Sequence, residues 1–318
     1  MRKKIKTTTK LNLFLDVLNK RRDNFHNIQS LFLEVDIGDD IYIEKLYDNN
    51  NNNNNNNNRS EITIDSNIES IKGSNNIIYK IWEKLKPHLL YKNSVNIYID
   101  KKIPLGSGLG AGSSDGVYTL MALCDLFNLK PDRDRIYNIV SSVGSDLPFF
   151  IEGGLQRVEG KGEQLSLIYK RCDDNNFYNG FALLIVCPKI QISTPYAYSL
   201  LNMKYKAGEN KGSKYKERIK HNEACIDNII KGIIERNPAL LSNNLFNIFE
   251  NYIFSEYKEL RYVKDTLKEF GAVVSLMSGS GASIFGVFFN SKLLEKAYNK
   301  FINLGYLCFK ASPMITNM

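Results

Sequence analysis

The chain has 318 residues, of which 43% are hydrophobic, 11% aromatic and 24% charged. This length and composition allow one large domain or two smaller ones with a buried core, and they exclude collagen-like, coiled-coil and disulfide-scaffold proteins. The chain carries 42 Lys and Arg against 34 Asp and Glu, and the net charge of +8 attracts anions without distinguishing nucleotide, phosphometabolite and nucleic acid. Five widely spaced cysteines without a CxxC pair predict free thiols in a reducing compartment rather than disulfides or a zinc site.

The N-terminal segment imitates a short signal peptide, because basic Met1–Lys6 precedes the apolar stretch Leu11–Leu18. Asn12 and Asp16 interrupt that stretch and no small-residue cleavage site follows it, so we expect a first β-strand and no leader. No stretch reaches the roughly 18 apolar residues of a membrane-spanning helix, so no membrane partner is expected.

The periodicity of apolar residues predicts the elements of the N-terminal half. Alternating or β-branched segments predict strands over Leu11–Leu18, Leu31–Asp36, Ile41–Leu46 and Val95–Asp100. Helical spacing predicts helices over Ile77–Leu90, Val117–Leu129 and Arg135–Val143. Between the third and fourth strands, the ten asparagines Asn49–Asn58 have no apolar face to bury. They predict a disordered insertion over residues 48–60 that extends a hairpin between Ile41–Leu46 and Glu61–Asp65.

The C-terminal half mixes a buried strand, a polar segment and an alternating series of elements. Phe181–Cys187 is a continuous apolar run typical of a buried central strand, and polar Lys206–Lys220 predicts a mobile loop or the start of a solvated helix. The last third predicts helix, strand, strand, helix and strand, over Glu256–Phe270, Ala272–Met277, Ser283–Phe289, Leu293–Leu304 and Tyr306–Lys310. This order favours an α+β sandwich of ferredoxin-like type, with a domain boundary near residues 155–180.

The most informative segment is the glycine-rich loop from Ile103 to Gly116, which lies between a predicted strand and a predicted helix. Its alternating glycines let the backbone approach a ligand closely, and Ser113 and Ser114 follow at the helix N-terminus, where free amides favour a phosphate. The alternative is a flexible turn in which Ser or Asp caps the helix. The density of glycine and small polar residues favours phosphate binding.

Three familiar loops fit this segment poorly. A P-loop requires Gly-Lys-Ser/Thr, and the loop contains no lysine; the protein-kinase motifs are also missing. Gly106-x-Gly108-x-x-Ala111 formally fits the dinucleotide fingerprint, but the acidic residues about 20 positions on, Asp132 and Asp134, open a helical stretch instead of ending a strand.

The loop resembles the phosphate loop of the GHMP small-molecule kinases, which has the form Pro-x-x-x-Gly-Leu-Gly followed by Ser-Ser. Within that superfamily the chain is most similar to the CDP-methylerythritol kinases. Four blocks in the same order carry the resemblance: Lys10–Leu15 with Phe25–Phe32, Pro104–Ser114, Gly144–Phe150 and Ser278–Ser283. The resemblance spans nearly the whole chain except the asparagine run and residues 204–220.

The resemblance implies an α+β fold of two-domain GHMP kinase architecture, with the active site in the cleft between the domains. The N-terminal domain, residues 1–165, would resemble ribosomal protein S5 domain 2 and bind ATP, and residues 166–318 would form a ferredoxin-like substrate domain joined by residues 11–32. The implied reaction transfers the γ-phosphoryl group of ATP, with Mg²⁺, to the C2 hydroxyl of CDP-methylerythritol in the non-mevalonate isoprenoid pathway. Family positions for a base and its lysine partner match Asp146 and Lys10.

Each of these two residues has an ordinary structural interpretation as well. Asp146 precedes Leu147-Pro148, between a helix end and a predicted apolar strand, and could be a turn aspartate. As a base it would accept the proton of the attacking alcohol. Lys10 lies in a basic N-terminus where lysines are usually solvated; paired with Asp146, it would keep the carboxylate ionised and help neutralise the transferring phosphoryl group.

The resemblance also implies the residues of the two binding sites. Those for ATP are Pro104, Gly106, Ser107, Gly108, Leu109, Gly110, Ala111, Gly112, Ser113, Ser114, Lys102 and Asn76. Those for the substrate are Asn12, Phe25, His26, Thr194, Pro195, Tyr198, Gly279, Ser280 and Gly281. Phe25 stands where tyrosine is common, and Tyr196 is a rival to Tyr198 as a stacking aromatic. Gly279 and Gly281 could simply form a tight hairpin. No carboxylate cage for a metal is evident, and Ser114 is the one candidate, as an indirect Mg²⁺ ligand.

The remaining expectations concern alternatives, partners and location. The rivals are another GHMP kinase acting on mevalonate, homoserine or galactose, a nucleic-acid-binding module and an NAD-dependent dehydrogenase. The leading interpretation predicts a small-molecule substrate, no nucleic acid, and a monomer or weak homodimer. The asparagine run and an excess of Lys, Asn, Ile and Tyr suggest an AT-rich eukaryotic genome with a plastid-type organelle of the apicoplast kind, although no leader is evident. Otherwise the pathway implies the cytoplasm.

Overall fold

The computed structural model describes residues 1–46, 61–89, 94–172, 180–202 and 213–315. The chain divides into two compact units, each assembled from separate stretches of sequence. Unit 1 comprises Met1–Thr8, Gly38–Ile103 and Gly110–Ile151, and unit 2 comprises Thr9–Ile37, Pro104–Leu109 and Glu152–Met318. The last crossing between them follows Ile151, whereas the sequence placed one boundary near residues 155–180. The asparagine run lies outside the described residues.

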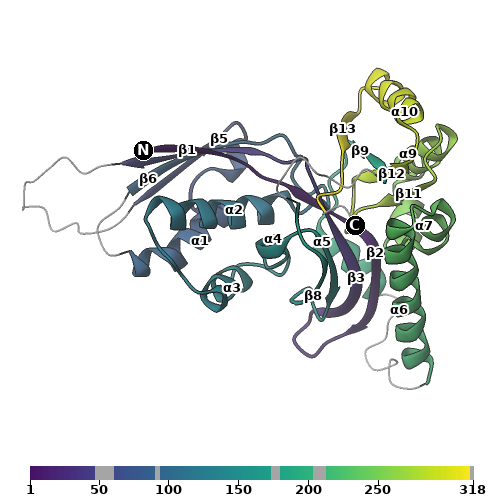
Figure 1. Ribbon diagram of the computed structural model, residues 1–318, viewed down its shortest axis with the longest axis horizontal. Helices are drawn as coiled ribbons and strands as arrows, with labels where there is room; N and C mark the ends of the chain where they lie inside the picture. The colour runs from purple at the N-terminus through teal and green to yellow at the C-terminus, as the bar shows by residue number, and fades with distance from the viewer. Residues whose placement is uncertain (47–60, 90–93, 173–179, 203–212, 316–318) are drawn as a thin grey trace, which may run out of the picture. The chain divides into compact units, whose positions relative to one another are not determined.

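Unit 1 is a four-stranded sheet with helices against one face (Figure 1). The strand order is β1-β4-β6-β5, where β1 and β6 are antiparallel to β4 and β5 is parallel to β6. The strands are β1 (Arg2–Lys6), β4 (Asp40–Leu46), β5 (Ile62–Ser66) and β6 (Ser94–Asp100). The helices are α1 (Ile77–Leu85), α2 (Ala111–Leu126), α3 (Arg133–Ser141) and α4 (Phe149–Glu152), with short 3-10 turns η1 (Glu69–Ile71), η2 (Gly73–Asn75) and η3 (Lys86–His88).

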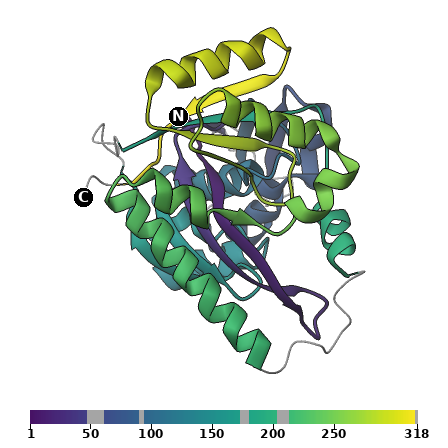
Figure 2. The same cartoon turned by 90° about the vertical axis from the view of Figure 1, so that its right-hand side faces the viewer.

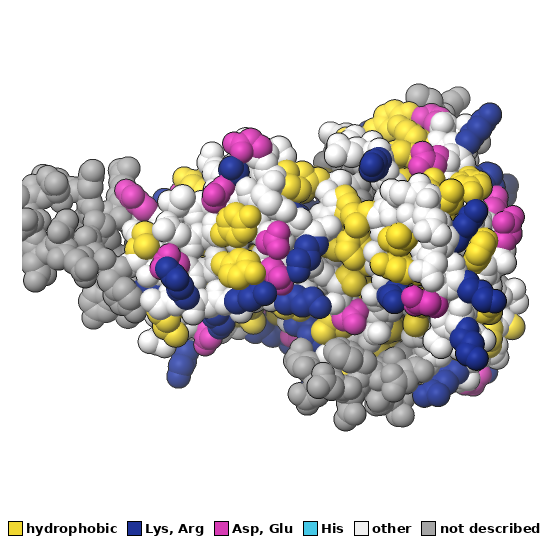
Figure 3. Space-filling view, turned by 90° about the horizontal axis from the view of Figure 1, so that it is seen from above, with side chains coloured by type: hydrophobic (Ala, Val, Ile, Leu, Met, Phe, Trp, Pro, Cys, Tyr) yellow, Lys and Arg dark blue, Asp and Glu magenta, His cyan; other side chains and the backbone are white. Residues whose placement is uncertain are grey.

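The core of unit 1 follows from the period-two alternation of its strands. In β6, Val95, Ile97 and Ile99 are buried while Asn96 and Tyr98 face outward, and β4 alternates in the same way. Helix α2 packs against β1 and β4, and the amphipathic helix α1 packs against α2 with its buried side chains Ile78, Ile81, Trp82 and Leu85. On the outer face of this sheet, hydrophobic side chains are interspersed with acidic and basic ones (Figure 3).

The predicted hairpin between Ile41–Leu46 and Glu61–Asp65 is wrong. The two segments form β4 and β5, but β6 lies between them and pairs with both. A parallel pair such as β5 and β6 needs a crossover connection, and α1 lies in that connection. The alternation identified each strand correctly, but it could not identify the pairing partner.

Unit 2 contains two sheets. The first has the order β10-β2-β3-β7-β8 and is dominated by the long antiparallel pair β2 (Thr9–Lys20) and β3 (His26–Val35). Its other strands are β7 (Leu155–Glu159), β8 (Gln164–Tyr169) and the short β10 (Phe246–Asn247), which is parallel to β2. The second sheet has the order β11-β12-β9-β13 and is antiparallel throughout. It consists of β9 (Ala182–Cys187), β11 (Val274–Met277), β12 (Ile284–Phe288) and β13 (Leu307–Ala311).

The helices of unit 2 are α5 (Thr194–Asn202), α6 (Ser213–Ile234), α7 (Pro238–Asn244), α8 (Glu250–Glu256), α9 (Lys258–Glu269) and α10 (Ser291–Asn303). Helices α9 and α10 pack against the second sheet, and the long α6 runs alongside β2 and β3 (Figure 2). The order of β9, α9, β11, β12, α10 and β13 confirms the predicted ferredoxin-like arrangement. The predicted buried strand at Phe181–Cys187 is the interior strand β9, and it is buried over Leu183–Cys187.

Several predicted boundaries move for identifiable reasons. Helix α1 ends at Leu85 rather than Leu90, because Pro87 follows in the 3-10 turn η3. Helix α2 begins at Ala111 rather than Val117, so part of the glycine-rich loop is helical. The apolar segment after Asp146 is the short helix α4 instead of a strand. Part of the polar segment Lys206–Lys220 lies outside the described residues, and the remainder opens α6.

Two absences concern only the part of the chain that the structure describes. No helix there is long and apolar enough to cross a membrane. All five cysteines are free thiols, as predicted, and four of them are buried.

Candidate active site

The glycine-rich loop adopts a backbone that side chains disfavour. Gly106, Gly108 and Gly110 have φ values of 65°, 77° and 68°, in the left-handed region that favours glycine. A Cβ atom on Gly108 would lie 2.2 Å from the backbone oxygen of Ser278, whereas one on Gly106 would meet nothing within 4 Å. The glycine at position 108 is therefore required both by its conformation and by a close backbone neighbour.

The loop ends at an N-terminus of α2 that no side chain caps. Gly110 occupies the cap position and has no side chain to offer, and the first N–H bonded within the helix is that of Ser114, to the oxygen of Gly110. The amides of the first turn, which includes Gly112 and Ser113, can thus serve an anion, and the helix dipole favours negative charge there. Ser114 is fully buried and its Oγ accepts the N–H of Thr8 at 3.2 Å.

A second glycine turn, Ser278–Gly281, packs against the first loop within unit 2. Ser278 Oγ donates to the oxygen of Gly108 at 3.0 Å, and the N–H of Ser283 donates to the oxygen of Ser107 at 3.1 Å. Gly279 and Gly281 have φ values of 57° and 95°, as the predicted tight turn requires. These contacts bring the two glycine motifs together although they are far apart in sequence.

Asn247 supports this turn, and the sequence gave no reason to single it out. Its buried amide donates to the oxygens of Met277 and Gly279 at 2.6 and 2.8 Å, while its Oδ1 accepts the N–H of Phe249. No periodicity or motif distinguishes this asparagine in an asparagine-rich chain. Only its place in the short strand β10 brings it to the turn.

Lys10 and Asn12 lie side by side on β2, and both are buried. Lys10 Nζ donates to Asn12 Oδ1 at 2.6 Å and lies 4.5 Å from the centre of the Phe32 ring. Asn12 Nδ2 in turn donates to Ser30 Oγ on β3 at 3.1 Å. The N–H of Lys10 donates to the oxygen of Leu109 at 2.9 Å, next to the phosphate loop. A solvated N-terminal lysine is therefore excluded, because Lys10 is only 4% exposed.

Three aromatic side chains, His26, Tyr198 and Phe249, are in contact where β3 begins. The rings of His26 and Tyr198 lie 4.8 Å apart at 32°, and Tyr198 meets Phe249 edge-on at 5.0 Å. Tyr196 instead donates its hydroxyl to Glu256. Tyr198, not its rival, is thus the tyrosine that meets His26. Phe25 is 52% exposed, with the Lys161 ammonium 4.9 Å from its ring centre.

Thr194 and Pro195 open α5 beside the second glycine turn. Thr194 Oγ1 lies 3.2 Å from Ser280 Oγ, within hydrogen-bonding distance. The structure thus brings Lys10, Asn12, His26, Tyr198 and the Ser278–Gly281 turn onto connected elements of unit 2.

Asp146 belongs to unit 1, where it is partly exposed just before α4. Lys10 belongs to unit 2, so the pairing of these two residues stays a prediction. Two predicted adenine-pocket residues have other contacts in unit 1. Asn76 caps α1 by accepting the N–H of Ile78 at 2.8 Å, and Lys102 Nζ lies 2.8 Å from Asp40 Oδ2.

Unit 1 contains a buried charge cluster whose members include residues just before the glycine-rich loop and at its end in the sequence, and the sequence analysis did not identify it. Lys101 Nζ donates to Asp39 Oδ2 at 2.5 Å and to Asp115 Oδ2 at 2.9 Å, and the three side chains are 2%, 0% and 6% exposed. Burial raises the pKa of Asp115 to about 7, opposed by Lys101 and reinforced by Asp39. Burial lowers the Lys101 pKa, but the two carboxylates outweigh it and the net shift is upward. The only sequence signal was Asp115 at the end of the glycine-rich motif.

In the described part of the chain, no three His, Cys, Asp or Glu side chains are placed so that they could bind one metal ion together. The Ser114 hydroxyl, the one candidate, is turned to the Thr8 backbone in the interior. We therefore assign no protein ligand to a metal.

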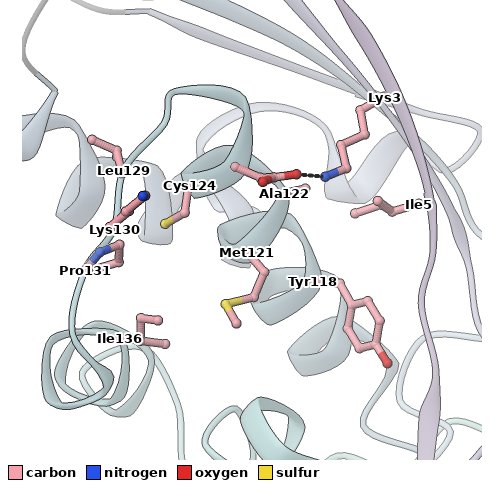
Figure 4. Close-up of a pocket in the computed structure, with 11 residues that line it drawn as sticks. Lys3, Ile5, Tyr118, Met121, Ala122, Cys124, Leu129, Lys130, Pro131 and Ile136 are labelled. Carbon is pink, nitrogen blue, oxygen red and sulfur yellow. Dashed lines mark hydrogen bonds and ion pairs between the residues drawn. The ribbon is translucent and has the colours of Figure 1, made fainter. Parts of the chain in front are cut away.

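Two cavities in unit 1 are lined by none of the predicted site residues. One, of about 490 Å³, lies between β1, α2 and α3, where Lys3 pairs with Asp125 and Tyr118 and Met121 project from α2 (Figure 4). The other, of about 710 Å³, lies on the outer face of the sheet around Tyr42 and Tyr98. Neither contains part of the glycine-rich loop.

Comparisons with known proteins identify the family of the chain. The family models of the GHMP kinases N terminal domain and the GHMP kinases C terminal match residues 76–154 and 229–307. A 4-diphosphocytidyl-2-C-methyl-D-erythritol kinase of Acetivibrio thermocellus is 31% identical over 96% of both chains, and one of Thermodesulfovibrio yellowstonii is 33% identical over 95% of both. The chain belongs to the 4-diphosphocytidyl-2-C-methyl-D-erythritol kinase family of GHMP kinases.

Solved structures of GHMP kinases share the fold. A crystal structure of 4-(cytidine 5'-diphospho)-2C-methyl-D-erythritol kinase aligns with a TM-score of 0.73 at 22% identity, covering 98% of this chain and 99% of that one. A mevalonate kinase of L. major aligns with a TM-score of 0.69 at 14% identity, covering 99% and 97%. Family membership confirms the predicted α+β GHMP architecture. The dehydrogenase alternative needs a doubly wound parallel sheet, whereas the loop here follows β6 of a mixed four-stranded sheet.

Replacing Gly108 tests the packing of the two glycine turns. We expect Gly108→Ala to lower the free energy of unfolding by about 2 kcal/mol or more, because a left-handed φ and a backbone clash add together. Gly106→Ala is the matched control with similar φ and open space, and should cost only about 1 kcal/mol. Urea unfolding of both variants measures these free energies. Equal losses of unfolding free energy in the two variants would contradict a clash with Ser278.

The raised pKa of Asp115 predicts how stability depends on pH. With a pKa of about 7 when folded and 3.8 as the ordinary value, its stabilising contribution is complete below about pH 4 and lost as pH rises to 7. Asp115→Asn cannot titrate, so its unfolding free energy should fall less steeply over this range, by up to about 1 kcal/mol per pH unit. Urea titrations over this range test it, with exposed Asp265→Asn as control. A slope unchanged in Asp115→Asn would contradict the shifted pKa.

Proposed function

We propose that the chain transfers the γ-phosphoryl group of ATP to the C2 hydroxyl of 4-diphosphocytidyl-2-C-methyl-D-erythritol, as a step of the non-mevalonate isoprenoid pathway. The observation that carries the substrate choice is the contact of His26 with Tyr198 of α5, because His26 lies on β3, which pairs with the strand β2 that carries Lys10 and Asn12. An imidazole and a tyrosine ring suit the hydrogen-bonding edge and the face of a cytosine. Three kinases of 31–33% identity that carry this name support the same assignment.

ATP binds by its phosphates at the glycine-rich loop in this proposal. The left-handed glycines expose the loop amides, and the uncapped first turn of α2 adds N–H groups and a favourable dipole. Asn76 and Lys102 remain predicted neighbours of the adenine. Mg²⁺ enters with ATP and is held by the phosphate oxygens, as is usual for this ion in phosphoryl transfer.

The chemical step needs little covalent work from the protein. The substrate oxygen attacks the γ-phosphorus, the bond from that phosphorus to the β–γ bridging oxygen breaks, and ADP leaves. Asp146 accepts the hydroxyl proton, and the Lys10 ammonium offsets negative charge on the transferring group. Lys10 is fixed for this role by Asn12 and Phe32, which hold its ammonium.

The substrate diphosphate is assigned to the second glycine turn. Gly279, Ser280 and Gly281 form this turn, and Asn247 holds it through the oxygen of Gly279. Thr194 and Pro195 lie beside the turn, at the start of α5. Phe25, exposed at the end of the same strand pair, offers a further ring face for the cytosine. A monomer or weak homodimer without nucleic-acid partners, and a plastid-type location, remain predictions.

The catalytic assignment predicts that Asp146→Asn lowers kcat at least about 100-fold while ATP affinity stays within about twofold, because only proton transfer and orientation are lost. ADP release with Mg-ATP would be measured on CDP-methylerythritol, mevalonate, homoserine and galactose. Exposed Asp134→Asn in unit 1 is the control.

Each outcome of this experiment decides something. Turnover on CDP-methylerythritol alone, lost in Asp146→Asn, supports both substrate and base. Turnover on another alcohol keeps the phosphate loop but contradicts the cytidine assignment. Undiminished turnover in the variant removes Asp146 from the mechanism, and salt-sensitive RNA binding without any turnover would favour the nucleic-acid alternative.

The cytosine assignment predicts a substrate-binding defect without a nucleotide-binding defect. His26→Ala and Tyr198→Ala should each raise the KM for CDP-methylerythritol about tenfold, as expected for one lost base contact, and leave the KM for ATP unchanged. Tyr196→Ala is the matched control, because Tyr196 contacts Glu256 instead of His26. A larger defect in Tyr196→Ala than in Tyr198→Ala would reverse the choice of tyrosine.

A further inference from the structure

The buried charges of unit 1 belong to a larger cluster that includes a threonine. Thr7 Oγ1 donates to Asp115 Oδ1 at 3.0 Å and accepts the N–H of Asp39 at 2.9 Å. Asp39 Oδ1 also accepts the N–H groups of Lys102 and Ile103, at 2.6 and 2.9 Å. We call Thr7, Asp39, Lys101 and Asp115 the Lys101 cluster.

The cluster lies where the chain enters and leaves unit 1. The chain crosses between the units after Thr8, Ile37, Ile103 and Leu109, and again after Ile151. Cluster residues, or amides bonded to them, lie within a few positions of the first three crossings, and Asp115 lies six residues beyond the fourth, one turn into α2. The same buried group therefore holds Ile103, the residue before the segment Pro104–Leu109, and a residue one turn into the helix that follows this segment.

The fit of the backbone around the cluster is tight. A Cβ atom on Gly38 would lie 2.1 Å from the oxygen of Thr7, so only glycine allows Asp39 to approach this segment. The N–H of Thr7 donates to the oxygen of Asp39 at 2.9 Å across the same contact.

The charge balance of the cluster bears on the phosphate loop. Asp115 lies one turn into α2, where a carboxyl that has lost Lys101 either repels an anion at the helix N-terminus or takes up a proton, because burial already raises its pKa. The Lys101 ammonium, 2.9 Å away in a low-dielectric interior, offsets that charge. A buried ion cluster is weak evidence of added stability, because desolvation costs about as much as the pairing returns.

We propose that the Lys101 cluster is a positioning device for nucleotide binding. It holds the residue before the loop, Ile103, and compensates the carboxylate of Asp115 one turn into α2, and none of its members is assigned to the substrate. The proposal rests on ATP binding at this loop, as proposed above. It predicts that Lys101 matters for ATP because of Asp115, not merely for folding.

A charge-rescue experiment tests this directly. Lys101→Met should weaken ATP binding at least about tenfold and leave the KM for CDP-methylerythritol within about twofold. Lys101→Met with Asp115→Asn, which also removes the carboxyl that has lost its partner, should restore ATP affinity to within about threefold of wild type. Calorimetric titration with Mg-ATP measures binding without turnover. Wild-type ATP affinity in Lys101→Met, or an unrescued double variant, overturns the proposal.

A neutral substitution decides the question if Lys101→Met does not fold. Thr7→Val removes the hydroxyl that joins Asp39 and Asp115 and should raise the KM for ATP about threefold with kcat unchanged, whereas Thr7→Ser keeps the hydroxyl and should behave as wild type. Thr119→Val is the matched control in unit 1, because its buried hydroxyl has no hydrogen-bond partner in the described structure. Equal effects of Thr7→Val and Thr119→Val would overturn the positioning role.

The readouts separate this inference from the proposed function. If the wild type binds ATP but phosphorylates none of the alcohols, the function fails while the charge rescue of ATP binding still tests the cluster. If the wild type phosphorylates CDP-methylerythritol and Lys101→Met changes the KM for both substrates equally, the function stands and the inference fails.

Discussion

The phosphate loop can bring its amides to an anion only because its backbone adopts conformations that side chains disfavour. Three left-handed glycines turn the chain, and at Gly108 even one methyl group would collide with the carbonyl oxygen of Ser278. The second glycine turn and its Asn247 support are built around this approach. Glycine therefore contributes twice, to the exposure of the amides and to the contact that holds the loop.

Buried polar side chains hold further parts of each unit. Lys10 is held by Asn12 and Phe32 in unit 2, and Lys101 by two aspartates in unit 1. Buried ammonium groups are costly unless opposite charges or good acceptors surround them. Within unit 1, Lys101 contacts two carboxylates, and within unit 2, Lys10 contacts the amide of Asn12 and the ring of Phe32.

The elements themselves could largely be predicted from periodicity. The alternation in β4 and β6 and the apolar runs of β2 and β9 identified these four strands, and the order of elements in the last third identified the ferredoxin-like sheet. The strands β1, β7, β8 and β10 were not predicted. The hairpin between β4 and β5 could not be corrected from sequence, because alternation says which face of a strand is buried and nothing about its neighbour. The start of α2 moved for a related reason, since glycine and serine carry little helical periodicity.

The sequence by itself determined the phosphate loop, the family and the residue types of the site, because close approach to a phosphate restricts the loop to glycine and small polar residues in a recognisable order. Only the tertiary structure decided that Tyr198 rather than Tyr196 meets His26, that Lys10 is buried, and that Asn247, Asp39 and Lys101 support the loops. These contacts join residues that lie far apart in sequence. A single lysine or asparagine in a chain rich in both carries no local sign of the partner that folding brings to it.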